Sequence, residues 1–247
     1  MKKTKTLVTG TMLAVGILFG TSVVANPVVM RVGLEPTGGQ ISAMQSFMSR
    51  ANQVAAQVSP NGSGTPLLIT NMFHGANSPG GASVAITFDS LEDWAATTAT
   101  QRSSSEWQAL LQTFPADGYA VNYQGLSEMV WQTQGATAPA PGNVLLVYNF
   151  DIVQGGLQPM MEFLERVTEV GRRENIGGQP ALLTPIVAGA DTNQTATVLI
   201  RFESAAAWAE ATARQNASSA WQAAFASFPV QNYQVTYQGM STIVPIP

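Results

Sequence analysis

Apolar side chains recur along this sequence with two periods, one typical of strands and one typical of helices. Short apolar runs rich in β-branched residues favour strands. Such runs lie at Val28–Leu34, Leu67–Phe73, Ala82–Phe88, Tyr119–Tyr123 and Val144–Phe150. Alternation within each run places every second side chain on the same face of a sheet.

Two longer segments instead repeat apolar residues at spacings of three and four, which makes one face of a helix apolar. The first stripe is Ile41, Met44, Met48, Ala51, Val54, Ala55 and Val58, and the second is Leu157, Met160, Leu164, Val167 and Val170. A further helix is predicted to begin after Ser90, because Asp93 completes a capping box three residues later. A short helix then carries Trp107 and ends before Pro115.

The sequence contains the same unit twice. Residues 82–130 align without a gap with residues 196–244, and 24 of these 49 positions are identical. Each copy has the order β-α-β-β-α-β, so we predict an α+β fold made of tandem ferredoxin-like units. The predicted boundaries are 26–131 for the first unit, 132–142 for a linker rich in Pro, Gly, Ala and Thr, and 143–247 for the second unit.

Two motifs occur in both copies. The motif F-[D/E]-S-x₃-W begins at Phe88 and Phe202, and the motif S-S-x-W-Q begins at Ser104 and Ser218. Together with the element order, they resemble the dimeric α/β-barrel superfamily, which includes antibiotic-biosynthesis-monooxygenase-like proteins. The resemblance implies that the two sheets close on each other into a barrel, so that one chain forms an intramolecular pseudo-dimer.

The N-terminal segment has the pattern of a secretory signal peptide. Lys2, Lys3 and Lys5 precede an uncharged, mostly apolar stretch over residues 7–24. We expect residues 1–25 to be this signal peptide, with cleavage after Ala25, a periplasmic or secreted mature protein and no later membrane contact. An uncleaved anchor is the alternative, although the apolar stretch is near the lower length limit for spanning a membrane.

Loss of that leader would change the charge of the chain. It would remove all three lysines and leave eight arginines against fifteen carboxylates, a formal charge of −7. So acidic a chain repels phosphate backbones, and nucleic acid is therefore not an expected partner. The chain has no cysteine and a single histidine, His74, which excludes Cys-ligated metal centres and multi-histidine sites. We therefore expect no metal and no cofactor.

The candidate ligand-binding residues come from the sheet face opposite the helices, because that face differs between the two copies. The residues predicted to point into the space between the sheets are Arg31, Thr87, Asn122, Arg201 and Thr236. His74, at a strand end, joins them as the one group that titrates near neutral pH. A partly polar pocket between the sheets would suit a small, mostly apolar molecule. Alternatively, these side chains face solvent or pair with carboxylates.

The repeated aromatic residues are predicted to pack beneath helices. The tryptophans in question are Trp94, Trp107, Trp208 and Trp221, which lie at core spacing on helical faces. The tyrosines are Tyr119, Tyr123, Tyr233 and Tyr237, which alternation places on the same side as Val121 and Val235.

Three functions are compatible with these patterns. The first is an exported barrel protein that binds a small, mostly apolar molecule between its sheets, with no evident catalytic constellation. The second, implied by the resemblance, is a cofactor-independent monooxygenase using His74, Arg31, Asn122 and Arg201. The third is a structural or assembly role with a closed core. Haem is an alternative cofactor, with His74 as its ligand in one half only. The sequence contains neither a P-loop nor a G-x-S-x-G elbow.

Overall fold

The computed structural model describes residues 25–247 except residues 61, 63, 65, 75–80 and 188–195. The predicted signal peptide, apart from Ala25, lies outside the described residues. Within the described part of the chain, no helix is long and apolar enough to cross a membrane.

Both halves of the chain have the element order β-α-β-β-α-α-β. The first half consists of β1 (Val28–Pro36), α1 (Ile41–Val58), β2 (Pro66–His74), β3 (Ala82–Phe88), α2 (Leu91–Ser103), α3 (Ser105–Leu111) and β4 (Tyr119–Gln132). The second half consists of β5 (Val144–Ile152), α4 (Gln158–Arg173), β6 (Gln179–Val187), β7 (Ala196–Phe202), α5 (Ala205–Ala217), α6 (Ser219–Ala226) and β8 (Tyr233–Val244). The predicted α+β class and ferredoxin-like order are confirmed.

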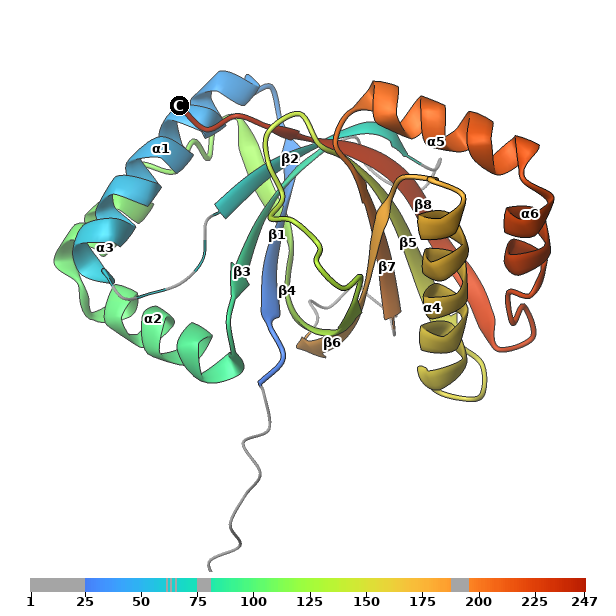
Figure 1. Cartoon of the computed structure of the whole chain (residues 1–247). Coiled ribbons are helices and arrows are strands. Elements are labelled where there is room, and N and C mark those ends of the chain that lie inside the picture. The colour runs from blue at the N-terminus through green and yellow to red at the C-terminus, as the bar shows by residue number, and fades with distance from the viewer. Residues whose placement is uncertain (1–24, 61, 63, 65, 75–80, 188–195) are drawn as a thin grey trace, which may run out of the picture.

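The eight strands form one closed antiparallel barrel in the order β1-β3-β2-β8-β5-β7-β6-β4. The two halves meet where β2 pairs with β8 and where β4 pairs with β6. Figure 1 shows α1–α3 covering one side of this barrel and α4–α6 covering the other. Each strand therefore has one face toward helices and one face toward the barrel interior.

The last strand of the first half is longer than predicted. The sequence pattern indicates a strand only over 119–123, whereas β4 continues to Gln132. Its second part pairs with β6 of the other half, from Leu126 opposite Val187 to Gln132 opposite Ala181. This pairing between distant segments stabilises a stretch that local alternation does not mark as a strand.

Two equivalent apolar cores lie between the barrel and its two helix layers. Met44, Phe47 and Leu68 belong to the first core. Their counterparts in the second core are Met160, Phe163 and Leu182. Val84 and Val198, on β3 and β7, also lie in these cores, on the helix side predicted for them.

A β-bulge at the same place in each half reverses the predicted orientation of two tyrosines. In β4 the bulge leaves Asn122 unpaired, because Gly33 pairs with Tyr123 while Leu34 pairs with Val121. Leu34 lies in the core on the helix side, so Gly33 and the opposing Tyr123 face the barrel interior. The prediction that Tyr123 packs beneath helices is therefore wrong.

The second half has the corresponding bulge at Thr236. Asn149 pairs with Tyr237, whereas Phe150 pairs with Val235. Phe150 lies in the second core, so Tyr237 also faces the barrel interior, contrary to the prediction. Tyr119 and Tyr233 precede the bulges and do lie in the two cores, as predicted.

Serine caps begin the helices that follow β7. Ser204 accepts a hydrogen bond from the Ala207 backbone N–H at 3.1 Å. We predict that Ser204→Ala lowers the free energy of unfolding by about 1 kcal/mol, because that N–H loses its partner. Urea unfolding measures this loss. Ser219→Ala, at the exposed first residue of α6, is the control and should change stability by less than about 0.5 kcal/mol. Equal effects of the two substitutions would contradict the capping role.

Candidate functional site

A cavity of about 650 Å³ lies in the second half of the molecule, between α4 and the helix-facing side of the barrel. We call it the α4 pocket. Residues of α4, α6, β5 and β7 line it, together with the end of β4 and the segment that follows. The α4 pocket is therefore outside the barrel, and not between the sheets where the sequence places a ligand.

Helix α4 supplies the wall of the pocket that lies opposite the barrel. Met160, Phe163, Leu164 and Val167 are buried and recur at spacings of three and four, so they share one face. Tyr148 and Phe150 project from β5 to the same side, because they are two residues apart on one strand. Val198 and Ile200 extend this apolar surface along β7.

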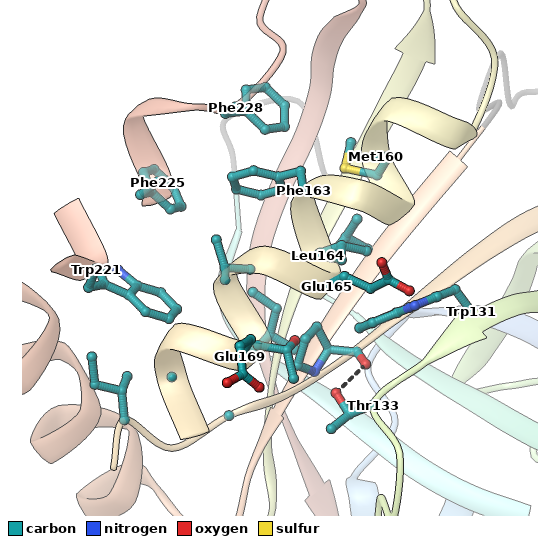
Figure 2. Close-up of a pocket in the computed structure, with 18 of the residues that line it drawn as sticks. Trp131, Thr133, Met160, Phe163, Leu164, Glu165, Glu169, Trp221, Phe225 and Phe228 are labelled. Atoms are coloured by element: carbon teal, nitrogen blue, oxygen red, sulfur yellow. Dashed lines mark hydrogen bonds between the residues drawn. The ribbon is translucent and has the colours of Figure 1, made fainter. Parts of the chain in front are cut away.

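Aromatic rings make up much of the pocket wall. The ring centroids of Phe163 and Phe228 are 5.0 Å apart with the rings nearly perpendicular, and Phe163 and Phe225 meet edge to face at 5.9 Å. Figure 2 shows Trp221 and Phe225 on one side of α4 and Trp131 on the other. An aromatic ligand could make the same offset or edge-to-face contacts with these rings.

One exchange between the two copies enlarges the space in the second half. Helix α4 has Gly171 where α1 has Ala55, and α6 has Ala224 where α3 has Leu110. Gly171 and Trp221 both line the pocket, and a Cβ on Gly171 would lie 3.3 Å from the Trp221 ring. Gly171 therefore leaves room in the pocket wall where α1 has a methyl group, whereas Ala224 is buried in the second core and is not part of the lining.

The edges of the two equivalent helices are covered by different segments. Beside α1, the carbonyls of Pro245 and Pro247 accept hydrogen bonds from Gln45 Nε2 at 2.8 Å and Ser49 Oγ at 2.5 Å, and Ile246 packs against the first core. Beside α4, the equivalent place belongs to Trp131 and the residues after it, which line the pocket. In the first half, the C-terminal segment therefore covers the edge of α1. In the second half, the equivalent edge of α4 borders the pocket.

Few polar groups reach the pocket. Thr133 Oγ1 donates to the Pro180 carbonyl at 3.0 Å, as Figure 2 shows. The buried hydroxyl of Thr168 has no hydrogen-bond partner among the described residues. Burial raises the pKa of Tyr148, and a hydrogen bond from Gln238 opposes this shift more weakly. Tyr148 is therefore an uncharged phenol at neutral pH.

Charged groups stay at the rim of the pocket. Arg172 and Glu169 line it and form an exposed ion pair with an N–O distance of 2.9 Å. An exposed pair of this kind is screened by solvent and contributes little to stability. Glu165 also lines the pocket and is exposed, so the charged groups of the lining lie at its solvent side and none is buried in its interior.

Tyr233 connects β8 to the start of α4. Its hydroxyl donates to the Gly156 carbonyl at 2.7 Å and accepts from the Met160 N–H at 3.0 Å. We predict that Tyr233→Phe lowers the free energy of unfolding by about 1–3 kcal/mol, because the buried Met160 N–H loses its acceptor and the Gly156 carbonyl loses its donor. Thermal and urea unfolding measure the effect. Tyr119→Phe is the matched control, since no such bond joins Tyr119 to a described residue, and a loss of similar size there would contradict the assignment.

Arg31 lies on the interior face of the barrel, as do Thr87 and Arg201, whose neighbours Phe88 and Phe202 pack on the helix side. Its guanidinium carbon is 6.0 Å from the centroid of the Tyr123 ring. Burial lowers the pKa of Arg31, and the nearby Tyr123 and Tyr237 partly oppose this shift. Arg31 is therefore remote in the fold from the α4 pocket, whose lining does not include it.

The other predicted site residues do not gather around Arg31. Asn122 and Thr236 occupy the unpaired bulge positions and are exposed, and Thr87 is exposed at the end of β3. Arg201 instead holds the segment between β4 and β5: it donates to the Ala138 carbonyl at 2.6 Å and to Thr137 Oγ1 at 2.7 Å. These contacts give Arg201 a structural role.

His74 ends β2, where its backbone is opposite Gly239. Its side chain lies outside what the structure describes, so its predicted role as a base or haem ligand stays a prediction. Sequence reasoning missed the pocket residues of α4 because their spacing indicated ordinary core packing. The available signal was the exchange of Ala55 for the smaller Gly171 in the second copy.

Solved structures share this fold across nearly the whole chain. A putative monooxygenase from Fusobacterium nucleatum subsp. nucleatum matches with a TM-score of 0.58 and 7% identity, over 90% of this chain and 94% of the other. A putative monooxygenase from Lactobacillus acidophilus matches with a TM-score of 0.54 and 10% identity, over 89% and 93%. A haem-binding protein from Thermus thermophilus matches with a TM-score of 0.50 and 9% identity, over 90% and 92%.

These likenesses show that the chain has the dimeric α/β-barrel, ferredoxin-like fold. Structural similarity at identities this low shows the fold and leaves the activity open. At the level of sequence, no family model and no curated protein matches the chain.

The α4 pocket does not fit haem. The usual protein ligands of haem iron are histidine, cysteinate, methionine and tyrosinate. No histidine or cysteine lines the pocket among the described residues, Met160 is only 1% exposed within the core, and the raised pKa of Tyr148 keeps its phenol protonated. The described residues also contain no cluster of three His, Cys, Asp or Glu side chains that could hold a metal ion.

Proposed function

We propose that this chain binds one small, mostly apolar aromatic molecule in the α4 pocket, and that it does so after export to the periplasm or out of the cell. The aromatic and aliphatic lining of the pocket is the observation that carries this proposal. Apolar surface removed from water contributes about 25 cal/mol per Å², so an enclosed apolar ligand gains affinity without ionic contacts.

The test uses the uncharged fluorescent probe N-phenyl-1-naphthylamine and the purified mature chain. We expect saturable fluorescence enhancement with one site per chain, because the enlarged space belongs to the second half. Two equal sites per chain, or no saturation, would contradict the proposal. Export is tested separately by N-terminal sequencing of the protein recovered outside the cytoplasm, which should begin at Asn26.

An enzymatic function is the second candidate, supported by the two structural neighbours described as putative monooxygenases. In a cofactor-independent reaction an electron-rich aromatic CH₂ group would be oxidised to a carbonyl. One atom of O₂ would enter the product, and the other would leave as water with the two hydrogens of that carbon. Oxygen uptake with anthrone-type substrates tests this candidate. Uptake no faster than without protein would remove it and leave the binding function intact.

A further inference from the structure

The barrel interior contains a half-buried cation that the proposed function does not use. Arg31 lies opposite Ala85 on β3 and Gly125 on β4. Its neighbours Met30 and Val32 pack against the helix-side cores, so alternation directs Arg31 inward. From this position, we infer that the barrel interior binds a small carboxylate at Arg31.

The positive charge of Arg31 has no counter-ion among the described residues. Among the described residues no carboxylate lies within ion-pair distance of Arg31, and its guanidinium carbon is 6.0 Å from the centroid of the Tyr123 ring. A buried charge is costly unless it is paired and hydrogen-bonded. A bound anion would provide the missing charge and accept hydrogen bonds from the guanidinium.

Two phenols flank the guanidinium, one from each half of the chain. The bulges turn Tyr123 and Tyr237 inward, and both lie close enough to Arg31 to affect its charge. Each tyrosine lies over a glycine two residues later, Gly125 or Gly239, where a Cβ would collide with the phenol oxygen. These glycines let the rings lie flat along the strands and keep the centre of the barrel free of further side chains.

The inward-facing side chains of β1 are less buried than their equivalents in the second half. Val29 and Arg31 are only half-buried although they face inward. Their counterparts on β5, Leu145 and Val147, are buried, with 7% and 6% exposure. The barrel interior is therefore asymmetric. Arg201, on the interior face of β7, is already hydrogen-bonded to Ala138 and Thr137, whereas Arg31 has no such partner among the described residues, so we expect one carboxylate per chain.

The chemistry of the site favours a singly charged carboxylate. The planar guanidinium matches the two oxygens of a carboxylate, and the phenol hydroxyls can donate to the same group. One cation balances one negative charge, whereas a dianion such as sulfate would bring an uncompensated charge into the interior.

Isothermal titration calorimetry at constant ionic strength tests this inference with acetate and benzoate, and with chloride and sulfate as comparison anions. We expect one site per chain for the carboxylates in the wild-type protein. Arg31→Met should weaken binding at least about tenfold, because a hydrogen-bonded charge pair is lost. Arg102→Met, which removes an exposed arginine of α2, should leave the affinity unchanged.

A second variant guards against a failure of Arg31→Met to fold. Tyr123→Phe with Tyr237→Phe keeps the cation and nearly all the volume, and should weaken carboxylate binding about three- to tenfold. Trp221→Ala, in the α4 pocket, should not change it. Undiminished carboxylate binding in Arg31→Met or in the double tyrosine variant would overturn the inference. Chloride binding as tightly as acetate, or loss of carboxylate binding in Trp221→Ala, would do so as well.

Discussion

Leu182→Ala is expected to lower the free energy of unfolding by about 2–5 kcal/mol. Leu182 on β6 has 0% exposure and packs in the second core with Met160 and Leu164 of α4. Truncation would remove the free energy gained by burying the leucine side chain. It would also leave a void between sheet and helix that the close-packed neighbours fill only in part. Urea unfolding followed by circular dichroism measures the loss.

The internal repeat provides a matched substitution for that experiment. Leu68 occupies the same position in the first half, also with 0% exposure, and packs with Met44 and Met48 of α1. Leu68→Ala should therefore fall in the same range of about 2–5 kcal/mol. A loss below about 1 kcal/mol for either variant would show that the two cores are not packed as described.

Trp221→Ala is expected to weaken binding of N-phenyl-1-naphthylamine at least about tenfold. Trp221 lies on α6 and forms one wall of the α4 pocket (Figure 2). Buried tryptophans are among the side chains whose truncation costs the most binding free energy, about 2 kcal/mol or more. Fluorescence titration of the folded variant measures the change in Kd.

Trp107→Ala separates a lost pocket contact from a general loss of packing. Trp107 is the counterpart of Trp221 on α3 and packs against the first core. Its truncation should destabilise the protein and leave the probe affinity within about twofold of wild type, because additive effects are usual for distant sites. A similar loss of affinity in both variants would indicate that the probe responds to stability and not to the α4 pocket.

Periodicity and the repeat were sufficient to predict the elements and their order. The stripe from Leu157 to Val170 became α4, and the runs beginning at Val28 and Val144 became β1 and β5. These predictions succeeded because burial of one face imposes a period of 3.6 on helices and of 2 on strands. The repeat then required both halves to have the same arrangement.

The inward orientation of Tyr123 and Tyr237 could not be predicted from these periodic patterns. A bulge adds one residue to a strand and reverses the alternation beyond it, and neither Asn122 nor Thr236 differs from an ordinary strand residue in the local pattern. The reversal depends on how β4 pairs with β1 and β8 with β5. It brings Tyr123 and Tyr237 toward Arg31, which the sequence had placed on the opposite face from them.

The α4 pocket escaped prediction for a different reason. Its wall consists of the same apolar stripe that would fill a closed core, and only the volume of the surrounding side chains decides whether a cavity remains. Gly171 reduces that volume, and Trp131 reaches the pocket from the far end of β4. A comparison of the two copies can show where a small side chain replaces a larger one. Such a comparison would have indicated the second half as the place of the pocket.

The location of a bound apolar molecule tests the central claim most directly. A crystal structure of the mature chain with 2-bromonaphthalene, recorded at the bromine absorption edge, would show the bromine by its anomalous scattering. We predict one bromine position per chain within the α4 pocket. Bromine located in the barrel interior beside Arg31, or beside α1 in the first half, would contradict the account.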